Sequence, residues 1–491
     1  MTANADRPSD PSHDLGDAAF GSREKLAIWL LLTSAFVVIL NETIMSVALP
    51  RLMSDLDITA AAGQWLTTAF LLTMSVVIPI TGMLIQRLRT RTLFAVAMGL
   101  FTAGTLIAAV APGFLVLLIG RIVQAGGTAI MMPLLMTTVV VLVPERQRGR
   151  LMGRIAIVIS VAPALGPTVS GLILQWLSWR WLFFFVLPIA VAALILGLLR
   201  LPNVGTQRMV RVDLLSVLLS VIGFGGIVWG LSASGEGPDA QSILPPLALI
   251  GIGLGGVLLF IWRQIRLQRD DRALLDLRTF RTRPFALAVV LFTFASMALF
   301  GTLILLPIYG QNVLGFTVLE SGLVLLPGGL LMGLLGPTVG RLVDQRGARF
   351  VLVPGLAITA LALWSLALLT DTSTIWQVLA SHLTLSLGLA GVYTPLFSVS
   401  LGSLPGHLAS HGSATLSTVQ QIGGAAGTAL FVTVMSVVSV AAAAPSVVVD
   451  AHALSEGTRA AFIVGGITMT IGALIAPFVT EARRLPAAPP R

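Results

Sequence analysis

The stretch LAIWLLLTSAFVVILNETIMSVALP, residues 26–50, decides the fold class. Residues 26–40 carry no charge, and about 20 consecutive apolar residues are enough to cross the hydrocarbon core of a bilayer. The stretch therefore predicts a membrane-spanning helix. Glu42 lies inside it, although an ionisable side chain at membrane depth is unfavourable unless it faces a cavity or a partner. Glu42 is accordingly the first candidate for a functional residue.

The composition extends this prediction to the whole chain. Of its 491 residues 56% are hydrophobic and 10% are charged, whereas about a quarter of the residues of a soluble domain are charged. The chain has no Cys, which excludes disulfides and thiolate metal sites. Residues 1–25 are polar and predict a disordered cytoplasmic tail, and the first apolar run is too long for a cleaved signal peptide.

Apolar runs separated by short polar connections predict the fold as an all-α integral membrane protein. We expect fourteen spanning helices, with boundaries good to about four residues. They lie near 26–49, 63–85, 93–111, 114–142, 151–174, 182–200, 213–233, 245–263, 285–310, 319–341, 350–370, 376–402, 414–440 and 459–480.

The basic residues collect in alternate connections between these spans. Examples are Arg87, Arg89 and Arg91; Arg146, Arg148 and Arg150; and Arg341, Arg346 and Arg349. The intervening connections hold only Arg51, Arg180 and Arg459, beside the acidic residues Asp55, Asp57, Glu236, Asp239, Asp371, Asp450 and Glu456. Cytoplasmic loops are enriched in Lys and Arg, so both termini are predicted to be cytoplasmic, in agreement with an even number of spans. The net charge of +9 then reflects topology, and nucleic acid is not an expected partner.

Two connections resemble each other: GMLIQRLRTR at residues 82–91 and GRLVDQRGAR at residues 340–349. In both, a Gly lies near the end of a span and a short basic turn leads into the next span. The repetition favours two related halves, a common plan in transporters. The alternative is that any short cytoplasmic loop between apolar helices is rich in Gly and Arg.

Several motifs, in order along the chain, resemble the major facilitator superfamily. GRLVDQRGAR resembles the superfamily's Gly-x-x-x-Asp-x-x-Gly-x-Arg loop, with Gln86 replacing the Asp in the first-half copy. RIVQAGGTA, residues 121–129, resembles the fourth-helix motif Arg-x-x-Gln-Gly, with Ala125 replacing its Gly. APALGPTVSG, residues 162–171, resembles the fifth-helix antiporter motif Gly-Pro-x-x-Gly-Gly, with Ser170 replacing one Gly.

Three further stretches resemble the fourteen-span drug:proton antiporter branch of that superfamily. They are NETIMSVALP at residues 41–50, WRWLFFFVLP at 179–188 and LLDLRTFR at 274–281. The resemblance implies a six-helix bundle at 26–200, two inserted helices with cytoplasmic linkers at 201–283, a second six-helix bundle at 284–480 and a cytoplasmic tail at 481–491. It also implies a monomer in the bacterial cytoplasmic membrane, without cofactor or metal.

Glu42 and Arg121 are the candidates for proton coupling. Arg121 lies about 10 Å into its span at about 1.5 Å per residue, and a buried guanidinium without a partner is unfavourable. Glu42 is the one acid placed deep in a span, so we expect the two to interact. The branch carries its acid at the position of Asn41, and we interpret Glu42 as taking over that role while Asn41 supplies a hydrogen bond. The alternatives are a Glu42 that reaches water at the outer rim and an Arg121 bonded only to backbone carbonyls.

The conformational candidates lie in spans 5 and 10. Small residues around Gly166, Pro167 and Gly171 predict close packing of span 5 against another helix, with span 10 and its glycines as the expected partner. The loop residues Gly340, Asp344, Arg346, Gly347 and Arg349 predict a cytoplasmic latch that opens when the halves rock. Ordinary Gly-rich packing and a solvated turn are the alternatives.

Polar and aromatic residues within the spans are the candidates for substrate binding. They are Asn41, Glu42, Trp65, Gln124, Tyr309, Gln311, Tyr393 and Phe397. Aromatic residues in membrane helices also serve packing or the interfacial belt, which is the alternative for each of them. His382, in span 12, is a weaker candidate for a titrating group.

The expected function is proton-coupled efflux of amphipathic organic compounds by alternating access, with protons and the lipid bilayer as the other partners. The chain has no Gly-x-x-x-x-Gly-Lys loop, so ATP-driven transport is not expected. The alternatives are an exporter of a native metabolite or lipid, a passive facilitator, and a membrane-embedded lipid-processing enzyme. An enzyme would cluster His, Asp or Glu at one face of the membrane, whereas the five His of this chain are scattered.

Overall fold

A computed structural model describes residues 22–142, 161–163, 165–203, 213–233, 245–270, 273–405, 408–443 and 450–479. These residues are helical apart from short connections, and they contain no strand. The predicted tail at 1–21, the basic connection with Arg146, the linker at 204–212 and the last residues from 480 lie outside the described ranges.

The first group of helices belongs to the N-terminal half. They are α1 (Ser22–Leu56), α2 (Ala60–Arg87), α3 (Thr90–Ala109), α4 (Phe114–Leu142) and α6 (Arg180–Arg200). Residues 161–163 and 165–176 are helical as well. Two helices follow, α7 (Leu214–Ala233) and α8 (Pro246–Leu267).

The second group begins after two short 3₁₀ turns, η2 (Gln268–Asp270) and η3 (Leu277–Arg281). It comprises α9 (Arg283–Asn312), α10 (Val318–Arg346), α11 (Ala348–Leu366), α12 (Ile375–Gly402), α13 (Ala409–Ala442) and α14 (Ala451–Ile475), followed by η5 (Ala476–Phe478).

Twelve of the described helices are long and apolar enough to cross a membrane. The apolar part of α7, residues 214–227, is shorter than the others, and residues 151–160 of the predicted fifth span lie outside the described ranges. The all-helical membrane fold is therefore confirmed, whereas the count of fourteen spans stays a prediction.

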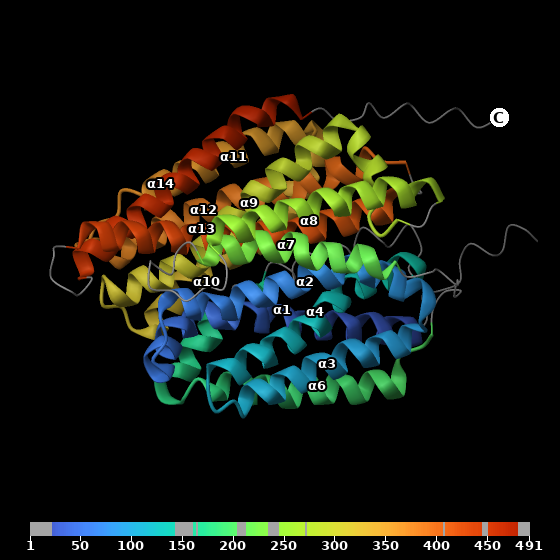
Figure 1. Cartoon of the computed structure of the whole chain (residues 1–491), viewed down its shortest axis with the longest axis horizontal. Helices are drawn as coiled ribbons and strands as arrows, with labels where there is room; N and C mark the ends of the chain where they lie inside the picture. Colours follow the sequence, from blue (N-terminus) through green and yellow to red (C-terminus); the bar gives the residue numbers. More distant parts are fainter. Residues whose placement is uncertain are drawn as a thin grey trace, which may run out of the picture.

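The helices form two bundles with separate apolar cores (Figure 1). One core is built by α1, α3, α4 and α6, and the other by α9 to α14. Val47 and Leu49, near the end of α1, pack into the second core. A smaller cluster joins the halves where Phe70 and Met74 of α2 meet Ala425 of α13. The two halves are thus in contact along α2 and α13 and again at the end of α1.

The helices α7 and α8 pack against each other as a hairpin outside the bundles (Figure 1). Within this hairpin Gly223, Gly226, Gly253 and Gly256 bring the two backbones so close that an added Cβ atom would collide with the partner helix. α7 contacts α2 of the first half and α13 of the second. The hairpin therefore covers the line along which the two halves meet.

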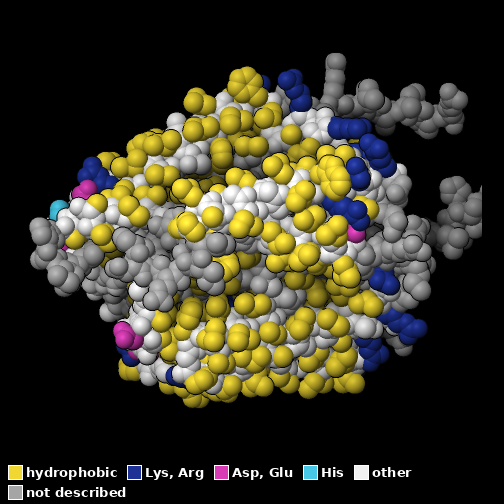
Figure 2. Space-filling model, viewed as in Figure 1, with side chains coloured by type: hydrophobic (Ala, Val, Ile, Leu, Met, Phe, Trp, Pro, Cys, Tyr) yellow, Lys and Arg dark blue, Asp and Glu magenta, His cyan; other side chains and the backbone are white. Residues whose placement is uncertain are grey.

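The surface is that of a membrane protein. Figure 2 shows hydrophobic side chains across the middle of the molecule, with Lys and Arg gathered at one end and most Asp and Glu of this view at the other. Leu199, Leu258, Leu334 and Leu361 are more than 60% exposed, which in water would be an unusual patch but in lipid is expected. We call the two ends the basic end and the acidic end.

Candidate functional site

Arg121, in the first half of α4, is fully buried and lies at the centre of a polar network. Its Nη1 atom donates to Asn41 Oδ1 at 3.0 Å and to Gln124 Oε1 at 2.6 Å. Its Nε atom donates to the carbonyl oxygen of Leu66 at 3.4 Å. The guanidinium also lies over the ring of Phe70, 4.0 Å from the ring centroid. One cation therefore connects α1, α2 and α4.

Close approach of α3 and α4 positions this network. An added Cβ atom on Gly104 would collide with the backbone of Gln124, and one on Gly120 would lie 2.8 Å from the backbone nitrogen of Ala108. Thr105 is thereby brought beside Gln124, whose Nε2 atom donates to Thr105 Oγ1 at 2.8 Å. Because Gln124 is fixed in this way, its oxygen points at Arg121.

The direct partners of Arg121 are neutral. Asn41 and Gln124 carry no charge, and the Nη2 atom of Arg121 has no hydrogen-bond partner among the described residues. A buried guanidinium is normally paired with a carboxylate. The site therefore keeps a buried positive charge that its hydrogen bonds hold in place but do not neutralise.

Glu42 follows Asn41 in α1 and points in a different direction, as expected from the 100° step of a helix. Its side chain is partly buried, and its Oε1 atom is buried without a hydrogen-bond partner among the described residues. Glu42 and Arg121 interact electrostatically. Among the described contacts, the hydrogen bonds of Arg121 go to Asn41 and not to Glu42, so the expected pairing of Glu42 with Arg121 in proton coupling stays a prediction.

The predicted packing of span 5 is found at two places. An added Cβ atom on Gly166 would lie 2.9 Å from the carbonyl oxygen of Leu40 in α1. Towards the acidic end, an added Cβ atom on Gly171 would lie 2.9 Å from the carbonyl oxygen of Val318 in α10, and Thr168 Oγ1 donates to the carbonyl oxygen of Gly322 at 3.2 Å. Span 5 therefore contacts both α1 and α10.

Two glycines nearer the basic end of α10 have no close contact among the described residues. An added Cβ atom on Gly336 or Gly340 would meet nothing within 4 Å in the described part of the chain. Residues 151–160 of the predicted fifth span lie outside the described ranges, so the expected packing of span 5 against this part of α10 stays a prediction.

The loop between α10 and α11 shows why its motif contains glycine. Gly347 has φ 84°, a conformation that side chains other than glycine rarely adopt, and it ends α10 directly before α11 begins. Arg346 lies over the ring of Phe350, 4.9 Å from its centroid, and Arg349 is exposed. The side chain of Asp344 lies outside the described part, so the predicted latch stays a prediction.

The substrate-binding candidates fall into separate groups. Asn41, Glu42 and Gln124 lie around Arg121. Trp65 meets Trp229 of α7 edge to face, with ring centroids 6.3 Å apart. The remaining candidates are in the second half or at the junction between the halves.

Of those, Tyr393 and Phe397 both pack edge to face on Phe292, each with ring centroids 5.1 Å apart, and Tyr393 is buried in the second core. Tyr309 is also buried and donates to the carbonyl oxygen of Thr370 at 2.6 Å. Gln311 Nε2 donates to the carbonyl oxygen of Val47 at 3.3 Å, which links α9 to α1.

Sequence reasoning missed Phe70 and Thr105, which complete the surroundings of Arg121 and Gln124. The signal for Thr105 was available, since Gly104 precedes it and Gly120 lies one position before Arg121. Such small residues permit close approach of membrane helices and would have paired spans 3 and 4. No comparable signal marks Phe70, because one aromatic residue in an apolar helix is not distinctive.

Comparisons with known proteins agree with this architecture. The family model of the Major Facilitator Superfamily matches residues 31–428. An uncharacterized MFS-type transporter of Bacillus subtilis, YcnB, is 41% identical over 93% of this chain and 95% of its own length. The lincomycin resistance protein LmrB of the same organism is 38% identical over 92% of this chain and 95% of its own.

Among solved structures, an auto-inhibited peptide transporter of the POT family superimposes with a TM-score of 0.66 at 15% identity, covering 94% of this chain and 99% of that one. This likeness concerns the fold. Together with the two bundles and the match over most of the chain, these findings show that the protein is a multi-pass membrane transporter of the major facilitator superfamily.

Proposed function

We propose that the protein exports amphipathic organic compounds in exchange for protons, with Glu42 as the group that binds either one. The observation that carries the proposal is the unpaired, buried Oε1 atom of Glu42 within the electrostatic influence of Arg121. A carboxyl group that protein groups already neutralise has no free oxygen for a proton or an organic cation. The Oε1 atom of Glu42, without a hydrogen-bond partner among the described residues, is such an oxygen.

In the cycle that we propose, Glu42 is protonated when no substrate is bound and ionised when an organic cation is bound. The hydrogen bonds of Arg121 to Asn41 and Gln124 hold the guanidinium in position without cancelling its charge. A fixed positive charge near a carboxyl group favours release of its proton, which supports the step in which the arriving cation replaces the proton.

The exchange then follows from competition for one carboxylate. An organic cation that enters from the cytoplasm meets protonated Glu42; the carboxyl proton leaves to the cytoplasm, and the cation pairs with the carboxylate that remains. After the halves rock, a proton from outside converts Glu42 to its neutral form, and the cation dissociates outward. Each cycle moves one carboxyl proton inward and one substrate outward, so neither bonds nor charges are left unbalanced.

The packing of α10 supports alternating access in this cycle. Gly322 and Gly171 keep span 5 and α10 in contact near the acidic end, while Gly336 and Gly340 have no close neighbour in the described part. We assign the basic end to the cytoplasm, because Lys and Arg favour cytoplasmic loops. The described conformation is then closed towards the outside.

The names of the relatives support the choice of the first substrate to test. Since proteins named for lincomycin resistance are 38–39% identical to this chain, lincomycin, together with lipophilic cations, is the first compound to test. Efflux is measured in inverted membrane vesicles under an imposed pH gradient. We expect Glu42→Gln to abolish efflux and the control Glu320→Gln, at the exposed capping box of α10, to retain it. Full efflux by Glu42→Gln, at equal protein levels, would remove the proposal.

A further inference from the structure

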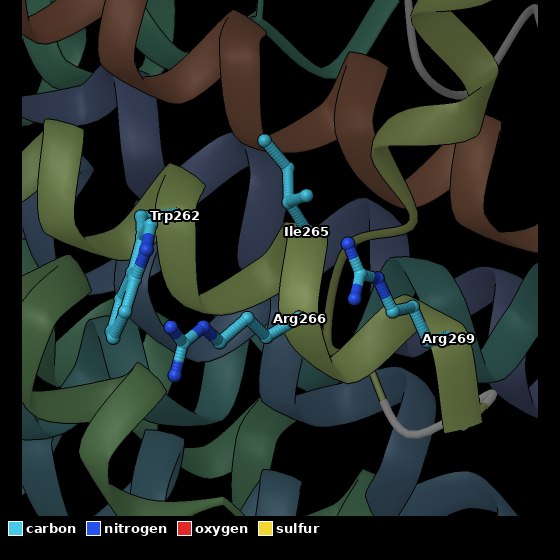
Figure 3. Close-up of a pocket in the computed structure, with 4 residues that line it drawn as sticks. All are labelled: Trp262, Ile265, Arg266 and Arg269. Carbon is cyan, nitrogen blue, oxygen red and sulfur yellow. The ribbon is translucent and has the colours of Figure 1, made fainter.

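A cavity of about 530 Å³ lies at the end of α8, away from the Arg121 network. It is lined by Trp262, Ile265, Arg266 and Arg269. Ile265 and Arg266 follow Trp262 by three and four residues, and Arg269 follows them by four and three, so the four share one face of the helix and its η2 continuation. Figure 3 shows Arg266 extending towards Trp262 and Arg269 reaching up beside Ile265.

The two arginines bring positive charge to the cavity, and among the described side chains no acid forms an ion pair with either of them. Asp213 forms its ion pair with Arg263, at 2.9 Å, and Asp276 pairs with Arg278. Arg266 stacks on Trp262, 4.1 Å from the ring centroid, and this fixes the direction of its guanidinium. The cavity is therefore cationic along one wall and aromatic along the other.

The same helix face continues as an apolar track. Trp262 is 48% exposed and Ile265 is 42% exposed. One and two turns further into the membrane, Leu258 and Leu254 are 66% and 52% exposed. A molecule that fits this face has an anionic group at one end, to meet the arginines, and long hydrocarbon chains, to follow the leucines.

We propose that this cavity binds the headgroup of one anionic phospholipid, whose acyl chains lie along Leu258 and Leu254. The positive charge of the arginines complements an anionic headgroup. The cavity also lies at the depth of the headgroup region, since Trp and Arg at the end of a membrane helix lie there. The bound lipid would contact the α7–α8 hairpin, which covers the junction of the two halves. The proposal concerns lipid binding and is independent of the transported substrate.

The test is native mass spectrometry of the full-length protein with phosphatidylglycerol and, separately, with phosphatidylcholine. We expect one phosphatidylglycerol to remain bound at collision energies that remove phosphatidylcholine. In the double variant Arg266→Gln and Arg269→Gln, its affinity should fall about 30-fold, since a basic residue near the membrane surface contributes about 1 kcal/mol to binding of an anionic lipid.

The matched control is the double variant Arg87→Gln and Arg89→Gln, which removes two exposed arginines near the start of α3. It should retain the bound phosphatidylglycerol. An equal loss in both double variants would show general charge attraction and overturn the proposal. Displacement of the lipid by millimolar inorganic phosphate would also overturn it, because the site would then recognise a free anion without needing acyl chains.

Discussion

At the scale of single residues, two neighbours in α1 differ in their contacts. Asn41 accepts a 3.0 Å hydrogen bond from Arg121, while a buried oxygen of Glu42 has no hydrogen-bond partner among the described residues. A carboxylate at position 41 would meet the guanidinium directly and form a buried ion pair, which is strongly stabilised against protonation once both charges are desolvated. We therefore expect the position of the acid to determine whether it can exchange a proton.

This difference between positions 41 and 42 predicts the result of moving the acid by one residue. The double variant Asn41→Asp and Glu42→Gln restores the number of acids but places the carboxylate against Arg121. We expect it to remain as inactive in proton-driven efflux as Glu42→Gln alone, because the new ion pair holds the carboxylate ionised. The measurement is efflux from inverted vesicles at matched protein levels. Recovery of efflux would show that position 41 can serve as the proton site.

The network around Arg121 predicts a second residue-scale effect. Gln124→Leu removes the 2.6 Å hydrogen bond to Arg121 and leaves Thr105 without its donor. Leaving a buried charged donor unsatisfied costs about 3 kcal/mol, so we expect a lower melting temperature of the purified protein and loss of efflux. Thr73→Val, which removes only a hydrogen bond within one helix, is the control and should change the melting temperature by less than about 2 °C. Equal effects of the two variants would contradict a special role for the network.

At the scale of elements, the α7–α8 hairpin is hydrogen-bonded to the residues that follow it in sequence. Arg263 of α8 donates two hydrogen bonds to Asp213, which directly precedes α7. Gln264 is fully buried; it donates to Ser216 and accepts from the backbone nitrogens of Leu274 and Leu275. These contacts fix the hairpin to the connection that enters the second half.

The Asp213 pair gives a pH-dependent prediction. The hydrogen bond from Arg263 is the main reason that the pKa of Asp213 is lowered to about 2 from its ordinary 3.8. A lowered pKa means that the stabilisation is complete above about pH 4 and is lost as the pH falls through about 2. Since Asp213 remains partly exposed, we expect Asp213→Asn to lower stability by about 1 kcal/mol, with the same shift in melting temperature at pH 6 and pH 8.

The control for this prediction is Asp55→Asn, which breaks an exposed ion pair with Arg51. Such pairs contribute little, and the melting temperature should stay within about 2 °C of the parent protein. A shift for Asp213→Asn that disappears between pH 6 and pH 8 would contradict the assignment, because Asp213 is ionised across that whole range.

The contact between span 5 and α10 gives another element-scale prediction. An added Cβ atom on Gly322 would lie 2.5 Å from the carbonyl oxygen of Pro167, so Gly322→Val forces the two helices apart at the acidic end. We expect efflux to fall at least about tenfold, because the closed state is lost. Gly336→Ala, where the added atom meets nothing within 4 Å of the described chain, should transport normally. Normal efflux by Gly322→Val would show that this contact does not take part in gating.

The sequence predicted the helices because membrane spans follow from length and apolar character alone. It also showed the two similar connections at residues 82–91 and 340–349. It also predicted that span 5 packs against α10. It did not single out Gly322 as a point of contact, since Gly322 and Gly340 look alike in sequence and only the structure places Gly322 against Pro167. Nor could it show that Asn41 and not Glu42 receives the hydrogen bond of Arg121, because that depends on the rotation of α1 by one residue.

At the scale of the whole molecule, the proposed alternating access requires the two halves to separate at the acidic end during each cycle. The chain contains no Cys, so a pair of introduced cysteines is reactive without background. Val47→Cys and Gln311→Cys replace residues that are joined by a 3.3 Å hydrogen bond across the halves. Linking them with a short bismaleimide should stop efflux, as closure becomes permanent.

The singly substituted proteins, treated with the same reagent, are the controls for this experiment and should continue to transport. Undiminished efflux by the linked protein would mean that the halves need not separate between α1 and α9. The path of the substrate would then have to be sought elsewhere in the molecule.

The central claim, that Glu42 exchanges its proton for cargo, is tested most directly by counting protons released when cargo binds. Purified protein in weakly buffered detergent solution is mixed with tetraphenylphosphonium, a lipophilic cation, near neutral pH with a pH-indicating dye present. We expect release of up to about one proton per bound cation, because one carboxyl group holds one proton. We expect no release from Glu42→Gln, while Glu320→Gln should behave as the parent protein. Equal proton release from the parent and Glu42→Gln would contradict this claim.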